Sequence, residues 1–168
     1  MTYGEIRLYH YEQNNMKRKQ YKIEINAPAE KTYDVMLGLS EKSTYEHWTS
    51  IFNPTSSFEG SWEKGGKIYF IGFDEKGKKG GMVARVAENT PSQFVSLQHY
   101  GILDGEQEIV DGPQVEEWAG GFENYTFERN GDKTNVTVDV DVTDDHLEYF
   151  DTTYPKALEK LKEMVEAS

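Results

Sequence analysis

His99 and Glu123 are the two side chains whose types and predicted positions could support acid–base chemistry. Alternating apolar and polar residues place both on the inner face of a predicted sheet, next to each other on neighbouring strands. An imidazole beside a carboxylate can orient a polar ligand group or transfer a proton, and the carboxylate favours the charged imidazole. The alternative is a hydrogen-bonded pair that closes the rim of the core and contacts no ligand.

This pairing is predicted from Asn130 and Gly131, a dipeptide typical of two-residue hairpin turns. Taking these two as the turn residues places Glu123 opposite Val138, and Val138 belongs to a run of inward-facing valines. Matching apolar partners on the preceding strand then places His99 directly opposite Glu123.

Eight further side chains are candidates for the wall of a ligand cavity, because they are large, apolar or aromatic and lie near the predicted inner face. They are Trp48, Trp62, Phe70, Met82, Trp118, Tyr125, Phe150 and Tyr154. For each of them the alternative is an ordinary place in the packed core, which is the usual position of aromatic residues.

Familiar motifs for cofactors, metals and nucleophiles are missing from the sequence. The glycine- and lysine-rich segment 76–81 lacks the spacing of a phosphate-binding loop, and the acidic segment 139–145 lacks the glycine and glutamate of a calcium loop. The four histidines show no paired metal spacing, cysteine is absent, and no Gly-x-Ser-x-Gly elbow is present. We therefore expect no cofactor, no metal site and no designated catalytic residue, so that enzyme activity stays an alternative to binding.

The chain of 168 residues has a net charge of −12, which is concentrated in its second part. Residues 101–168 contain 18 acidic and 5 basic side chains, whereas residues 1–100 are nearly neutral. This distribution is unfavourable for nucleic acid and for an anionic membrane surface. No apolar run reaches the length of a membrane span, and residues 1–15 lack the apolar stretch of a signal peptide, so we expect a cytoplasmic location and no membrane insertion.

Hydrophobic periodicity predicts an α+β chain with the order strand, two helices, six strands and a long helix. The first strand covers 21–25, and helices follow from 29 and over 41–48. Further strands are predicted at 55–60, 67–73, 79–88, 93–100, 116–128 and 133–142, with an irregular loop at 101–115 and the last helix at 144–167. The sheet should be antiparallel, and the apolar stripe of the last helix should cover it.

The string from Tyr21 to Met36, with its Ala-Pro-Ala turn at residues 27–29, resembles the opening of the START-like SRPBCC superfamily. The stretch 58–68 resembles its second and third strands, 123–138 its late hairpin, and 154–162 its terminal helix. Within that superfamily the chain is most similar to the branch of activator of heat-shock-protein-90 ATPase homologue-like domains. The resemblance covers about residues 17–165.

The resemblance implies a helix-grip fold, in which a seven-stranded antiparallel sheet wraps around the long C-terminal helix. It also implies one domain over residues 16–168, preceded by an extension of uncertain order at residues 1–15. In relatives, a cavity between sheet and helix binds lipids, polyketides or other hydrophobic molecules. The expected partner is therefore a hydrophobic small molecule. The alternatives are a chaperone or other protein partner recognised through the acidic segment 101–117, and a cyclase- or dehydratase-like enzyme that uses His99 and Glu123.

Overall fold

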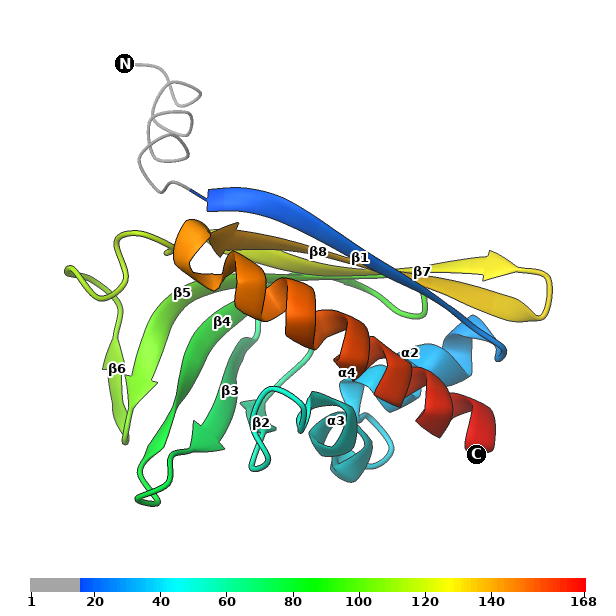
Figure 1. Cartoon of the computed structure of the whole chain (residues 1–168), viewed down its shortest axis with the longest axis horizontal. Helices are drawn as coiled ribbons and strands as arrows, with labels where there is room; N and C mark the ends of the chain where they lie inside the picture. The colour runs from blue at the N-terminus through cyan, green and yellow to red at the C-terminus, as the bar shows by residue number, and fades with distance from the viewer. Residues whose placement is uncertain (1–15) are drawn as a thin grey trace, which may run out of the picture.

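The computed structural model describes residues 16–168 of the chain. The predicted extension at residues 1–15 lies outside the described residues. A curved antiparallel sheet lies over one long helix, α4, and two shorter helices, α2 and α3, fill the space beside it (Figure 1). The expected α+β helix-grip architecture is confirmed, with two helices after the first strand and a long C-terminal helix packed on the sheet.

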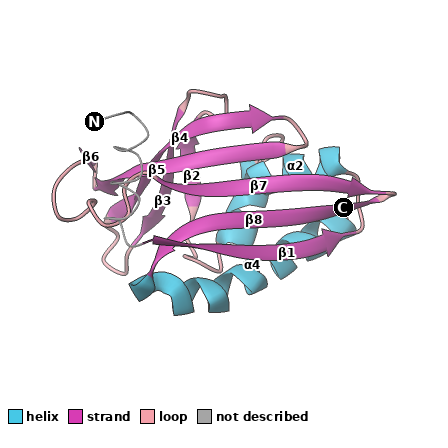
Figure 2. Ribbon diagram, turned by 90° about the horizontal axis from the view of Figure 1, so that it is seen from above, coloured by secondary structure: helices cyan, strands magenta, loops and turns pink. Residues whose placement is uncertain are grey.

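The elements follow one another in the predicted order, with one additional short strand. They are β1 (Met16–Ile25), α2 (Ala29–Leu37), α3 (Lys42–Thr49), β2 (Ser57–Gly60), β3 (Lys67–Phe73), β4 (Lys79–Thr90), β5 (Phe94–Asp104), β6 (Gln107–Ile109), β7 (Gly121–Asn130), β8 (Lys133–Thr143), the 3₁₀ turn Asp144–His146 and α4 (Leu147–Ala167). Seven strands are arranged in the order β1-β8-β7-β5-β4-β3-β2, and β6 pairs with the end of β5. Figure 2 shows α4 running along the edge of the sheet that β1 forms.

The prediction of an irregular loop at 101–115 is wrong for the first half of this segment. β5 continues to Asp104, and Gly105 adopts a positive φ of 63°, so that the chain reverses at once and pairs again as β6. Glycine reaches this backbone conformation without a steric penalty. Conversely, residues 116–120, predicted as strand, form turns, and β7 begins only at Gly121.

The predicted register of the last hairpin is shifted by two residues. Asn130 pairs with Lys133, so the turn residues are Gly131 and Asp132. Glu123 therefore lies opposite Val140 instead of Val138. A shift of two residues keeps every side chain on its predicted face, because side chains alternate with a period of two.

The main core lies between the concave face of the sheet and the helices. β8 contributes its alternate valines, and α4 contributes Tyr154, Leu158, Leu161 and Val165, all of which are buried. α4 makes its most extensive contacts with β1, α3 and α2. The helix is therefore held on one side of the sheet, below β1 and β8. Within residues 16–168 no helix is both long and apolar enough to cross a membrane.

Tyr21 of β1 ties this strand to α4. Its ring stacks on that of Tyr154 with centroids 5.1 Å apart, and its hydroxyl donates a 2.7 Å hydrogen bond to the carboxylate of Asp151. The hydrogen bond from Tyr21 lowers the pKa of Asp151 below its ordinary value, and Lys19 lowers it further through its own hydrogen bond and its positive charge. Burial, together with the same carboxylate, raises the pKa of Tyr21.

We expect the substitution Tyr21→Phe to return the pKa of Asp151 towards the ordinary carboxyl range, because it removes the strongest interaction that lowers this pKa. Since the folded-state pKa lies below the unfolded value, the stabilisation from Asp151 is present near neutral pH and disappears as the pH falls through the folded-state pKa. The variant should therefore lose less stability on acidification than the wild type. Carbon-13 NMR titration and urea unfolding at neutral and acid pH measure both effects.

The control is Tyr149→Phe, which removes a hydroxyl from an exposed tyrosine on the same helix. An Asp151 titration that is the same in Tyr21→Phe and wild type would contradict this description of the contact between β1 and α4.

Candidate ligand-binding cavity

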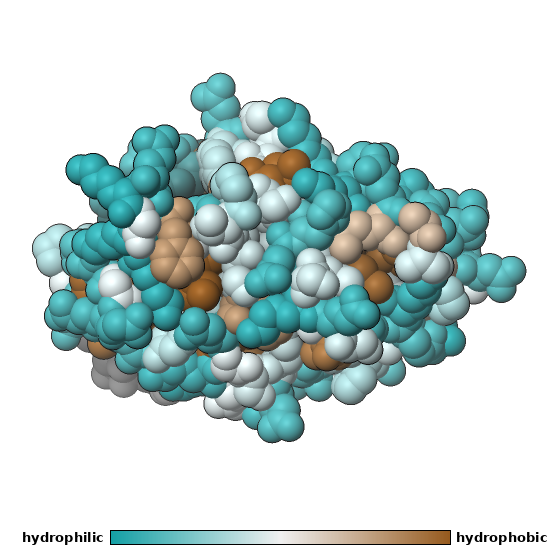
Figure 3. Space-filling view, turned by 90° about the horizontal axis from the view of Figure 1, so that it is seen from below, coloured by the Kyte–Doolittle hydropathy of each residue, from teal (hydrophilic) through white to brown (hydrophobic). Residues whose placement is uncertain are grey.

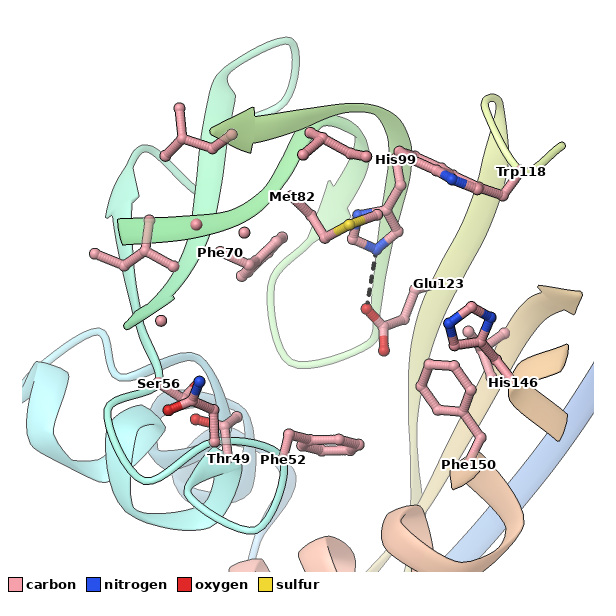
Figure 4. A pocket seen from close by; sticks show the side chains of 18 of the residues that line it. Thr49, Phe52, Ser56, Phe70, Met82, His99, Trp118, Glu123, His146 and Phe150 are labelled. Atoms are coloured by element: carbon pink, nitrogen blue, oxygen red, sulfur yellow. Dashed lines mark hydrogen bonds and ion pairs between the residues drawn. The ribbon is translucent and has the colours of Figure 1, made fainter. Parts of the chain in front are cut away.

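A cavity of about 970 Å³ opens between the concave face of the sheet and the N-terminal half of α4. Its walls come from β3, β4 and β5 on one side, the 112–120 turns above, α4 on the other side, and α3 with the segment after it below (Figure 4). Viewed from below, the surface of the molecule is mainly hydrophilic and carries several separate hydrophobic areas (Figure 3).

Nine of the ten predicted site residues lie in the wall of this cavity. They are Trp48, Phe70, Met82, His99, Trp118, Glu123, Tyr125, Phe150 and Tyr154. Trp62 is the exception. It is buried behind the wall, where its ring packs against Tyr45, Phe58 and Phe70 with centroids 5.4–6.2 Å apart, and it therefore has the core role.

The two other tryptophans occupy different depths of the cavity. Trp48 of α3 is 1% exposed, and its indole N–H donates a 2.8 Å hydrogen bond to the Met36 carbonyl of α2, which fixes the ring as part of the cavity floor. Trp118 lies at the rim, on the 112–120 turns, where its indole N–H donates to the Gln114 carbonyl over 3.0 Å. Both rings present an apolar surface while their polar atom is satisfied elsewhere.

His99 and Glu123 are in contact, although they are not directly opposite each other. His99 pairs with Gly121 across the ladder, and Glu123 pairs with Leu97, so the predicted pairing is two residues out of register. The two side chains share the inner face and meet on the diagonal, with His99 Nε2 3.1 Å from Glu123 Oε1. Diagonal neighbours on one face remain within reach of long side chains.

Glu123 also accepts a hydrogen bond from the Tyr154 hydroxyl through its second carboxylate oxygen, Oε2. The carboxylate therefore has one donor on each oxygen, from β5 and from α4. Burial raises the pKa of Tyr154 and of neighbouring Tyr125 well above that of a free tyrosine, and the negative charge of Glu123 raises both further. Both phenols consequently remain neutral in the folded protein.

The other ring nitrogen of His99, Nδ1, is buried and has no hydrogen-bond partner among the described residues. The contact with Glu123 is therefore the one side-chain hydrogen bond that His99 makes within the described residues.

Sequence reasoning missed several residues that shape the cavity. Phe52, after α3, packs edge-on against Tyr154 at 5.0 Å and faces the cavity from below. Gly72 and Gly80 pair across β3 and β4 on the face that also carries Phe70 and Met82. Neither has a side chain of its own, and the Asn53 side chain packs against Gly72. Continuing the alternation from Phe70 and Met82 by two residues would have identified these two glycines.

Comparisons of the sequence find no matching protein-family model and no matching curated protein. Solved structures do match. The Aha1 protein of Colwellia psychrerythraea, described as a dimer, superimposes with a TM-score of 0.64 at 23% identity, over 90% of this chain and 97% of that one. The chain has an Aha1-like fold. The likeness suggested by the sequence is thus confirmed at the level of the fold.

Two further proteins have the same architecture as this Aha1-like chain. An uncharacterised protein of Rhizobium leguminosarum matches with a TM-score of 0.57 at 16% identity, over 91% of this chain and 97% of its own. A protein of Nitrosomonas europaea matches with a TM-score of 0.63 at 16% identity, over 89% and 94%. Identities this low establish a common fold, and function must be argued from the site itself.

We expect Tyr154→Phe to lower the free energy of unfolding by about 2 kcal/mol, because a partly buried carboxylate loses one of its two donors. The loss should be clearly smaller when Glu123 is already replaced by Gln, since the charged acceptor is then gone. Urea unfolding of the wild type, both single variants and the double variant measures this coupling.

Tyr149→Phe is again a suitable control, because its exposed hydroxyl donates only to the Phe52 carbonyl, and the change should stay within about 0.5 kcal/mol. If Tyr154→Phe cost the same with Glu123 as with Gln at that position, the hydrogen bond between α4 and Glu123 would not stabilise the fold.

Proposed function

We propose that this chain binds a hydrophobic small molecule in the cavity between the sheet and α4. One observation supports this most strongly: the space beside α4 is hollow and its lining is mainly apolar, with nine aromatic side chains among the lining residues. Its volume of about 970 Å³ lies at the upper end of the range usual for small-molecule sites. An apolar ligand is favoured in such a cavity, because its binding removes water from the ligand surface and from the aromatic side chains of the wall.

The cavity wall contains flat rings in several orientations. Phe52, Phe70 and Phe150 face the space from the segment after α3, from β3 and from α4, and Tyr125 and Trp48 also line it. An aromatic or polycyclic ligand can stack on such rings or meet their edges, with a gain beyond burial of area alone. We therefore propose that the ligand is a ring-containing molecule with a largely apolar body.

Two alternatives predicted from the sequence receive less support. The acidic segment was a candidate surface for a protein partner, yet Asp104, Glu106 and Glu108 lie within 2.6–3.4 Å of Lys78, Lys79 and Lys67. Much of its charge is therefore matched within the chain. His99 and Glu123 form an acid–base pair that an enzyme could use, but the hollow apolar walls are explained by binding alone.

We expect the neutral fluorescent probe N-phenyl-1-naphthylamine to bind the wild type with one site per chain, and Gly80→Leu to weaken binding at least about tenfold. A leucine at this position projects into the cavity, and its Cβ meets only the Leu103 carbonyl at an ordinary 3.5 Å. Fluorescence titration gives affinity and stoichiometry, and circular dichroism checks the fold of the variant.

Glu75→Leu is the matched control, since it adds the same side chain at an exposed position of the same hairpin. Its probe affinity should equal that of the wild type. The absence of saturable probe uptake by the wild type, or equal uptake by Gly80→Leu, would refute binding in this cavity.

A further inference from the structure

We propose that the ligand carries a positively charged amine that pairs with Glu123. This inference rests on the proposed function and specifies the chemistry of the bound molecule. Glu123 presents a carboxylate in a cavity whose lining is mainly apolar, and its side chain is only 15% exposed. A carboxylate so far removed from solvent is expensive unless it is well compensated.

The partners of Glu123 compensate its charge only in part. His99 Nε2 and the Tyr154 hydroxyl each occupy one lone-pair direction of the carboxylate. A carboxylate has about four such directions, so about two remain for a ligand. Figure 4 shows the carboxylate of Glu123 directed into the open space between His99, Phe52 and Phe150.

The partners of Glu123 are an imidazole nitrogen and a phenol, and no lysine or arginine of the described residues is paired with it. The Tyr154 hydroxyl donates to the carboxylate without adding charge. The carboxylate thus has no permanently cationic partner among the described residues, and a cationic ligand group would supply one.

The lysines in the cavity wall are already paired with other carboxylates. Lys78 contacts Asp104 at 2.6 Å, and Lys79 contacts Glu59 and Glu106 at 3.3 and 3.4 Å. Neither lysine forms an ion pair with Glu123, whose hydrogen-bond partners are His99 and Tyr154. An ammonium group is therefore the complementary partner for this position.

The surrounding rings favour the same ligand charge. Phe70 lies next to His99 with ring centroids 5.8 Å apart, and Phe52 and Phe150 pack around Tyr154 at 5.0 and 5.9 Å. The faces of such rings carry negative potential and attract cations. A ligand carboxylate would instead be placed beside Glu123 in a poorly solvated space, where like charges repel strongly.

The test compares three ligands that share one naphthyl body: 2-(2-naphthyl)ethylamine, 2-(2-naphthyl)ethanol and 2-naphthylacetic acid. At pH 7 they are cationic, neutral and anionic. We expect the amine to bind the wild type about tenfold more tightly than the alcohol, as for one charged hydrogen bond, and the acid to bind most weakly. Isothermal titration calorimetry gives the three affinities.

Glu123→Gln should abolish the preference of the protein for the amine over the alcohol. Glu128→Gln is the matched control, because this exposed glutamate lies on the same strand and its loss changes the net charge equally. Glu128→Gln must retain the preference for the amine over the alcohol. This result separates pairing of the amine with Glu123 from attraction of the amine to the acidic protein as a whole.

Each outcome decides between the claims. If the acid binds as tightly as the amine, or if the preference survives in Glu123→Gln, the amine assignment is wrong while hydrophobic binding stands. If the preference is lost in Glu128→Gln as well, it reflects net charge and the assignment is again wrong. If none of the three compounds binds the wild type, both the assignment and the proposed function fail.

Discussion

A single helix cannot cover the whole concave face of this sheet, and the rest of the architecture follows from that limit. α4 is held against β1 by the stacking of Tyr21 on Tyr154 and by the Tyr21–Asp151 hydrogen bond, and against α2 and α3 by apolar packing. The inner face of β3, β4 and β5 consequently has no helix directly over it. The paired glycines at 72 and 80 contribute no side chain of their own to that face, and the Asn53 side chain packs against Gly72. The uncovered part of the sheet becomes the wall of the cavity.

The polar centre of the cavity depends on the same placement of α4. Tyr154 faces the sheet from α4, stacks on Tyr21 and donates its hydroxyl hydrogen to Glu123. One aromatic residue thus links the position of the helix to the orientation of the only glutamate in the cavity wall of the described chain. The raised pKa values of Tyr125 and Tyr154 follow from this arrangement, because burial and a nearby carboxylate both disfavour the phenolate.

Much of the fold was predictable because its signals are local or strictly periodic. The alternate valines of β8 identify the inner face, and that face survives a register error of two residues, which is why the contact of His99 with Glu123 was predicted although the directly opposite partners were wrong. The strand β6 was missed because it depends on a positive φ at Gly105 and on contacts of Glu108 with Lys67 and Tyr69, which are distant in sequence. The core role of Trp62 and the cavity role of Phe52 depend on how α3 and its following segment pack, and no single-strand pattern contains that information.

The central claim is that the space beside α4 is hollow and accepts an apolar ring. A crystal structure of the protein soaked with 2-(2-naphthyl)ethanol tests it most directly. We expect electron density for one naphthyl ring between Phe70, Phe52 and Phe150, with the polar end near Glu123. An interior in which these three side chains close on one another, with no space and no ligand density between them, would contradict it.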